Sequence, residues 1–174
     1  MANYWLSLED LSDEGRTYHI RDQKIWTDPI SEFNLSYSLI EPLDAVLFCL
    51  LQEEGCLVQG KLKGKISLPC SRCAEPAEYT LDVVFQIFEI FAWKKTKEDI
   101  GPQFLRDDRG FLEIDAAGIL WEQFILHLPD KPLCSDQCLG LCPHCGQNLN
   151  FGQCKCHEDQ VDPRLEIFRK LKIK

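Results

Sequence analysis

The sequence predicts an α+β fold: an antiparallel β-sheet or partial barrel, one main helix, and a cysteine-rich C-terminal module that ends in a short helix. Three observations predict this class. Two segments, 56–68 and 79–85, alternate apolar and polar residues as strands do. Residues 116–127 carry apolar side chains at helical spacing. Six of the ten cysteines lie between Cys134 and Cys156.

Composition is typical of a soluble protein with a real core. The chain has 174 residues, of which 45% are hydrophobic and 27% charged. This length predicts one domain, or one domain with a small metal-bound appendage. With the cysteines gathered near the C-terminus, we expect a β-rich body with its helix over residues 1–133 and a cysteine-rich zinc-binding module with a basic tail helix over 134–174. No apolar run is long enough to span a bilayer, and the acidic N-terminus does not resemble a secretory signal. We therefore expect a cytoplasmic protein, whose paired cysteines bind metal more often than they form disulfides.

The clearest predicted elements are the two strands joined through residues 69–76. In the first strand the inward side chains are Val58, Leu62, Ile66 and Leu68. The second strand alternates from Tyr79 onward, so the two strands form a hairpin with one solvated face. From Val84 to Phe91 both faces become apolar, which predicts that this end of the strand is covered.

The exposed face of the first strand carries a basic stripe: Lys61, Lys63 and Lys65. The stripe could contact phosphate groups of a partner, or it could pair with acidic residues across the hairpin. Placing Leu68 opposite Ala77 puts Lys63 opposite Asp82, which favours the second interpretation.

The N-terminal third gives weaker signals. Residues 4–8 predict a short edge strand, and 11–34 are polar with a turn signal that ends at Pro29. Within this segment Trp26 and Phe33 are expected to be core aromatics.

The remaining elements of the body follow from local patterns. Residues 45–51 are continuously apolar, which predicts a doubly buried strand but is also compatible with a helix. The charged residues 94–109 predict a loop, and 111–114 a short strand. Asp115 is then the predicted N-cap of the main helix, which ends before Pro129.

The cysteines fall into close pairs. The middle pair of the C-terminal module lies in Cys142-Pro143-His144-Cys145-Gly146, the form of a zinc knuckle, in which the glycine lets the backbone turn tightly after the second thiolate. Together with an upstream C-x2-C pair, the module supplies eight thiolates, enough for two closed structural Zn²⁺ sites.

Locality divides these eight cysteines into two sets. One set is local to the C-terminal module: Cys142, Cys145, Cys154 and Cys156. The other joins the hairpin loop to the chain that follows the helix: Cys70, Cys73, Cys134 and Cys138. Cys49 and Cys56 have the character of small buried hydrophobes.

The same residues allow other interpretations. A redox role for Cys70 and Cys73 is disfavoured, because a redox C-x2-C pair usually opens a helix rather than joining two strands. His127 is a candidate ligand but is more typical of a packed core residue, and His144 is expected to point outward. The sequence shows no clustered acid–base pair, phosphate loop or nucleophile motif, so we expect no enzymatic activity and no small-molecule substrate.

Charge is uneven along the chain, whose net charge is −9. Residues 161–174 hold five basic and two acidic residues, so this segment is net positive and the remainder strongly acidic. Residues 162–172 predict a short amphipathic helix with candidate partner-binding residues Arg164, Arg169, Lys170 and Lys172. Its apolar face could instead dock on the protein's own body, and both possibilities remain open.

Several segments together resemble the YceD family, the large ribosomal RNA subunit accumulation proteins, long described as a domain of unknown function. The matching segments are the hairpin motif Cys70-Ser71-Arg72-Cys73 with Pro76, residues 122–129 with 132–134, 140–150 with 154–156, and 162–165. The resemblance covers roughly residues 43–171.

The resemblance implies a non-catalytic factor in ribosome biogenesis that supports accumulation or processing of large-subunit (23S) ribosomal RNA. It implies precursor RNA or a ribosomal protein as partner, with a small zinc-knuckle protein of the large subunit as one candidate. No membrane partner is expected. The alternative class is a thiol-redox or metal-handling protein that uses the C-x2-C pairs.

Overall fold

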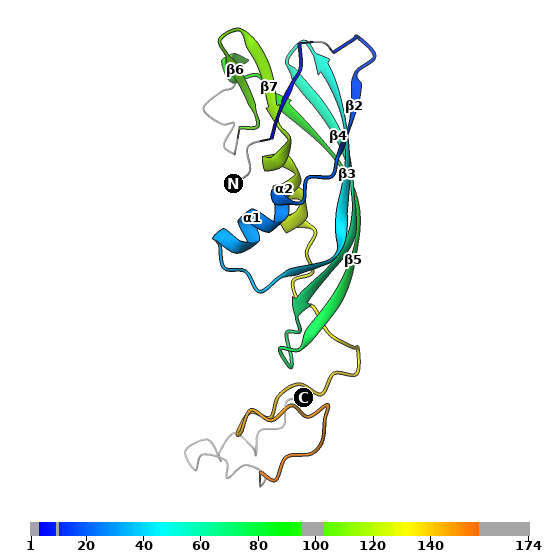
Figure 1. The fold of residues 1–174 in the computed structure, drawn as a ribbon, viewed down its shortest axis with the longest axis vertical. Coiled ribbons are helices and arrows are strands. Elements are labelled where there is room, and N and C mark those ends of the chain that lie inside the picture. The colour runs from blue at the N-terminus through cyan, green and yellow to red at the C-terminus, as the bar shows by residue number, and fades with distance from the viewer. Residues whose placement is uncertain (1–3, 10, 95–102, 157–174) are drawn as a thin grey trace, which may run out of the picture.

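The computed structural model describes residues 4–9, 11–94 and 103–156 (Figure 1). The predicted helix at 162–172, and with it the four basic residues proposed for partner binding, lies outside the described residues. None of the helices in the described part of the chain is long and apolar enough to cross a membrane.

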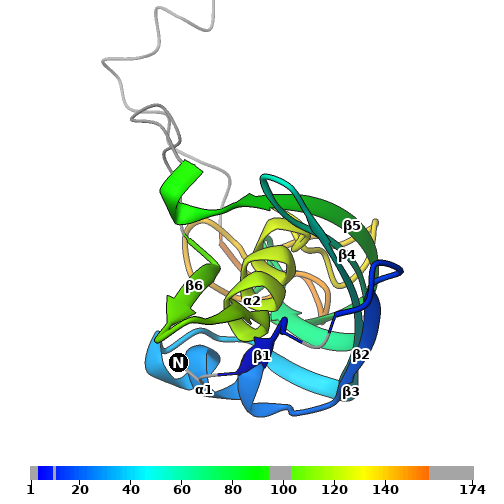
Figure 2. The same cartoon turned by 90° about the horizontal axis from the view of Figure 1, so that it is seen from above.

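Two antiparallel sheets build the body. The larger sheet has the strand order β2-β3-β4-β5, with β2 at Arg16–Ile20, β3 at Ser38–Gln52, β4 at Gly55–Pro69 and β5 at Pro76–Ile90. The smaller sheet has the order β1-β7-β6, with β1 at Trp5–Ser7, β7 at Phe111–Asp115 and β6 at Leu105–Asp108. Seen from above, the larger sheet curves around α2 (Figure 2). This arrangement confirms the α+β class.

Two α-helices fill the concave side of the large sheet: α1 at Lys24–Glu32 and α2 at Ala116–Leu126, with a short 3-10 turn η1 at Ala92–Lys94. The predicted N-cap of α2 is confirmed, because the side chain of Asp115 accepts a hydrogen bond from the backbone N–H of Gly118 at 2.9 Å. The helix is apolar on most sides and is largely buried, which is typical of a helix at the centre of a core.

The predicted hairpin is confirmed in detail. β4 and β5 pair without interruption, with Leu68 opposite Ala77 and Lys63 opposite Asp82. Gly60 lies opposite Phe85, and a Cβ atom at Gly60 would lie 2.0 Å from Cζ of that ring. The glycine is therefore required because the aromatic ring occupies its side-chain space on the inner face.

The prediction for residues 11–34 was wrong. This segment forms β2 and α1, and Pro29 lies inside α1 rather than in a turn. Tertiary contacts compensate: Trp26 is buried as expected, and the side-chain amide of Gln23 exchanges two hydrogen bonds of 2.9 Å with the backbone of Leu43. These contacts outweigh the local cost of a proline within the helix.

Phe33 was also wrongly assigned to the core, since it is 49% exposed. It lies at the C-terminal end of α1, where its ring stacks on Trp121 at a centroid distance of 6.5 Å. The ring thus covers the outer side of α2 without entering the core.

Two further corrections concern the strands. Val84 and Phe88 on the outer face of β5 are 72% and 42% exposed, so this end of the strand is not covered as predicted. Part of the charged segment 94–109 forms β6, which pairs with β7. Two hydrogen bonds from Arg106 of β6 to Glu113 of β7, at 2.7 and 2.9 Å, pair one charge of this segment across the strands. Residues 45–51 are a strand, as the first alternative stated.

Candidate metal centres

The first group of thiols, here called the hairpin cluster, is Cys70, Cys73, Cys134 and Cys138. The turn between β4 and β5 positions the first two. Cys70 donates its backbone N–H to the carbonyl of Glu75 at 2.8 Å and accepts from the N–H of Ala74 at 2.9 Å. The N–H of Ser71 donates to the carbonyl of Pro132 at 2.8 Å, which fastens the turn to the chain leaving α2.

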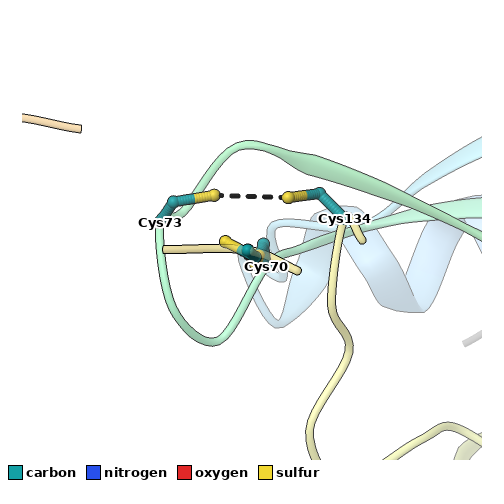
Figure 3. A group of neighbouring side chains, drawn as sticks. Cys70, Cys73 and Cys134 are labelled. Carbon is teal, nitrogen blue, oxygen red and sulfur yellow. Dashed lines mark hydrogen bonds between the residues drawn. The ribbon is translucent and has the colours of Figure 1, made fainter. Parts of the chain in front are cut away.

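The spacing of the sulfur atoms in the hairpin cluster fits one tetrahedral metal ion. Figure 3 shows Cys73 and Cys134 facing each other, with their Sγ atoms 3.6 Å apart and Cys70 beside them. The Sγ atoms of Cys70 and Cys138 are 3.8 Å apart. A tetrahedral Zn–S₄ site with bonds of about 2.3 Å has sulfur–sulfur edges of about 3.8 Å. All four sulfurs lie within 4.8 Å of one another, so the cluster can hold an ion without large rearrangement.

The second group, here called the C-terminal cluster, is Cys142, Cys145, Cys154 and Cys156. The knuckle turn is closed by hydrogen bonds from Cys142 N–H to Gln147 O at 2.8 Å and from Gly146 N–H to Cys142 O at 2.9 Å. Gly146 has φ = +73°, a conformation that glycine adopts without a Cβ clash. Cys142 is buried whereas Cys145 and Cys156 are exposed, so this cluster is the more open to solvent.

In each cluster the pKa of at least one thiol is lowered, which favours the thiolate form that binds a cation. For Cys70, burial raises the pKa, but backbone N–H donors, that of Arg72 foremost, outweigh it and bring the pKa to about 6. The N–H groups of Cys145 and His144 bring the pKa of Cys142 to about 6. In the hairpin cluster burial raises the pKa of Cys73 to about 12, and hydrogen bonds with the neighbouring thiols of the cluster act in the same direction.

The other two cysteines confirm their expected burial. Cys49 and Cys56 are fully buried in the core between the sheet and the helices. A hydrogen bond that the Cys49 thiol donates to Cys56, together with burial, raises the pKa of Cys49. A thiol held in its neutral form is a poor metal ligand and a poor nucleophile.

The lysine stripe is largely paired within the hairpin. Lys63 Nζ lies 3.3 Å from a carboxylate oxygen of Asp82, and Lys65 forms a salt bridge with Glu78. Lys61 lies opposite Val46 and Val84. The cross-strand interpretation therefore accounts for two of the three lysines.

Neither His127, the candidate ligand, nor His144 belongs to a thiol group among the described residues. His127 caps α2, with its ring Nδ1 2.8 Å from the carbonyl of Gln123. It is exposed, so the expectation of a packed core histidine was wrong. His144 is exposed on the knuckle, as expected.

Two side chains around the hairpin cluster were not predicted as part of it. The guanidinium of Arg72 donates to the carbonyl of Cys138 at 2.9 Å, and the amide of Asn150 donates to the sulfur of Cys138 at 3.3 Å. Arg72 lies within the C-x2-C motif, which was a usable signal. Asn150 is twelve residues from Cys138, and no local pattern indicates that contact.

Comparisons with known proteins identify one matching family and several relatives. A family model described as large ribosomal RNA subunit accumulation protein YceD matches residues 58–172. The uncharacterized protein Rv2926c of Mycobacterium tuberculosis (strain ATCC 25618 / H37Rv) is 35% identical over 120 residues, which are 64% of this chain and 53% of the relative. The uncharacterized protein Mb2951c of Mycobacterium bovis gives the same values. The chain thus spans about half the length of these mycobacterial relatives.

A relative that matches along its length is the uncharacterized protein YlbN of Bacillus subtilis (strain 168). It is 24% identical over 151 residues, 86% of each chain. No solved structure matches the chain. The family implies a role in the accumulation of large-subunit ribosomal RNA, and the two thiol clusters fit metal binding. Since the family model covers more than half of the residues and includes both clusters, this chain belongs to the YceD family of large ribosomal RNA subunit accumulation proteins.

Proposed function

We propose that this protein is a non-catalytic, zinc-stabilised factor that supports the accumulation or processing of large-subunit (23S) ribosomal RNA in the cytoplasm. It does so by binding precursor RNA or a ribosomal protein. One observation carries the proposal: eight cysteines of a chain from this family gather into two four-thiol groups, each compact enough for one ion. Four thiolates close the coordination of the ion, so the role of the metal is structural.

Zinc is the metal that suits these donors best. Thiolates are soft ligands, and Zn²⁺ accepts four of them in tetrahedral geometry without a redox change. In the hairpin cluster the ion would be held by the β4–β5 turn and by the chain leaving α2. In the C-terminal cluster it would hold the knuckle closed.

The redox alternative has less support. Cys70 and Cys73 lie in a turn between two strands, whereas a redox C-x2-C pair usually opens a helix. Each of them also faces a third or fourth thiol at contact distance. That arrangement suits a shared ion better than reversible disulfide exchange between two sulfurs.

The uneven charge of the chain suggests different partners for its acidic body and its basic segment. The net charge of −9 opposes bulk binding of RNA, and two of the lysines on the stripe are neutralised by acidic neighbours. The acidic body instead suits a basic ribosomal protein, for which a small zinc-knuckle protein of the large subunit is a candidate. The basic segment that follows the C-terminal cluster is the candidate for contact with RNA.

The metal content is directly testable. We expect two zinc ions per chain when the full chain is purified under reducing conditions without chelator, because both clusters have tetrahedral spacing. Mass spectrometry of metals gives the ratio, and native mass spectrometry shows whether both ions are in one molecule. A chain without metal, or with all ten thiols freely reactive in the native state, would contradict the proposal.

The biological role needs a measurement in cells. Depletion of the protein from its host should lower the ratio of large- to small-subunit ribosomal RNA, and precursor particles of the large subunit should accumulate. The wild-type gene restores the ratio, whereas a gene with both clusters disabled by Cys73→Ser and Cys145→Ser does not. An unchanged ratio after depletion would remove ribosomal RNA accumulation from the proposal.

A further inference from the structure

The side chain of Asn150, which lies between Cys145 and Cys154 of the C-terminal cluster, contacts one sulfur atom of the hairpin cluster. The Nδ2 atom of Asn150 donates to Cys138 Sγ at 3.3 Å, and its Oδ1 atom accepts from the backbone N–H of Leu139 at 2.8 Å. Asn150 therefore binds the ligand itself and the residue that follows the ligand. It is the only side-chain amide among the described residues for which a hydrogen bond to a cysteine sulfur is found.

We propose that Asn150 is a positioning residue that couples the two metal centres, so that an ion in the C-terminal cluster strengthens metal binding in the hairpin cluster. This inference rests on the proposed metal binding at both clusters. It goes beyond that proposal because two four-thiol sites need not influence each other.

The loop that carries Asn150 is closed by the C-terminal cluster. It lies between Cys145 and Cys154, both in that cluster, so an ion there ties together the two ends of the loop. Inside the loop, Oδ1 of Asn148 accepts from the backbone N–H of Asn150 at 3.0 Å and from its Nδ2 at 2.8 Å. These contacts fix the rotamer of Asn150 only while the loop keeps its shape.

Further contacts join this loop to the β4–β5 turn. The N–H of Leu149 donates to Gly140 O at 2.9 Å, and the N–H of Leu141 donates to Arg72 O at 3.1 Å. The amide of Asn148 also lies 3.4 Å from a carboxylate oxygen of Glu75. A continuous set of hydrogen bonds thus runs from the knuckle to the motif that holds Cys70 and Cys73.

The hydrogen bond to sulfur matters because of charge. Four thiolates around one divalent ion leave two negative charges, and Cys138 is only 3% exposed, so water offsets little of that charge. A donor aimed at the sulfur stabilises the charged site and orients the ligand. Removing such a partner of a metal ligand typically lowers metal affinity by about 10- to 100-fold.

Coupling of this kind has two consequences. Binding at the C-terminal cluster raises the affinity of the hairpin cluster, and by thermodynamic reciprocity the converse also holds. Because the C-terminal cluster is more exposed, we expect it to release its ion first. The hairpin cluster then releases its ion faster than it would with the loop closed.

The test uses the full-length zinc-loaded chain and a chromophoric chelator as competitor. The variant Asn150→Asp keeps an oxygen for the N–H of Leu139 but loses the donor to sulfur. We expect it to lower the zinc affinity of the hairpin cluster about 10-fold or more. Gln153→Ala, an exposed amide in the same loop, is the matched control and should leave that affinity unchanged. Cobalt-loaded protein gives a second readout, a shift of the thiolate charge-transfer band in the Asp variant only.

A double-mutant cycle tests the coupling itself. Cys145→Ser disables the C-terminal cluster, and it should weaken zinc binding at the hairpin cluster by a similar factor. If Asn150 acts through the closed loop, adding Asn150→Asp to Cys145→Ser lowers the affinity no further. Fully additive effects, or wild-type hairpin affinity in either single variant, would overturn the coupling while leaving two zinc ions per wild-type chain. Absence of zinc from the wild-type chain would instead overturn the proposed function.

Discussion

Replacing Cys73 by serine should cost the body its structural metal and lower its melting temperature by on the order of 10 °C, since losing a thiolate ligand removes several kcal/mol of metal-linked folding energy. The hairpin cluster joins positions 61 residues apart in the chain, Cys73 and Cys134. A metal site that joins distant segments lowers the conformational entropy of the unfolded chain strongly, so its loss should lower the stability of the whole body. Calorimetry together with metal analysis measures both parts of this expectation.

The matched control is Cys145→Ser, the same substitution in the other cluster. The four thiols of the C-terminal cluster all lie within residues 142–156. We therefore expect the Cys145→Ser variant to keep one zinc ion. Its main unfolding transition should stay close to that of the wild type when zinc is in excess. Proteolysis should then cut the C-terminal module while the β-rich body survives. If both variants lose the same ion and share one unfolding profile, the division of the eight thiols into these two groups is wrong.

The sequence predicted the central hairpin well because two signals agree there. Alternation of period two fixes which side chains of β4 and β5 face the core, and a one-residue shift would have exposed Leu62 and Ile66. The C-x2-C pair marks the position of the turn, and the position of the turn sets which residues of β4 and β5 lie opposite each other. Agreement between the periodicity and the turn leaves a single pairing, and it is the one found.

Elements that depend on distant contacts were not predictable in the same way. α1 contains Pro29 and has no side-chain N-cap, so its local sequence argues against a helix. It is held by the burial of Trp26 and by the amide of Gln23 paired with Leu43. β6 likewise depends on β7. Its charged sequence does not predict a strand, and the strand is stabilised by pairing with β7 and by the ion pair between Arg106 and Glu113.

For the candidate metal centres, the grouping of cysteines followed from locality, since the C-terminal set can close on itself and leaves the other four together. The roles of neighbouring residues did not follow. Asn150 is twelve residues from Cys138, and only the folded chain brings its amide to that sulfur. The grouping of the cysteines is thus visible in their spacing along the sequence, whereas the side chains that contact their sulfur atoms come from tertiary structure.

Removing the segment after Asp159 should abolish most association of the protein with precursor particles of the large ribosomal subunit. The segment holds the net-positive part of an otherwise acidic chain, including Arg164, Arg169, Lys170 and Lys172. If these four side chains contact phosphates, affinity falls steeply with salt, with a slope of roughly −3 to −4 on logarithmic axes. Sedimentation of the full and shortened chains with purified particles, over a series of salt concentrations, measures both quantities.

Two full-length variants separate the two roles that the sequence allows for this segment. Changing the four basic residues to glutamine keeps the apolar positions Leu165, Phe168 and Leu171, whereas changing these three to serine keeps the charge. Phosphate contact predicts that the first variant loses both association and salt dependence. Docking of the segment on the protein's own body predicts that only the second variant is impaired, through stability. Equal association of the full and shortened chains would instead direct attention to Lys61, which lies between two apolar neighbours while Lys63 and Lys65 are paired.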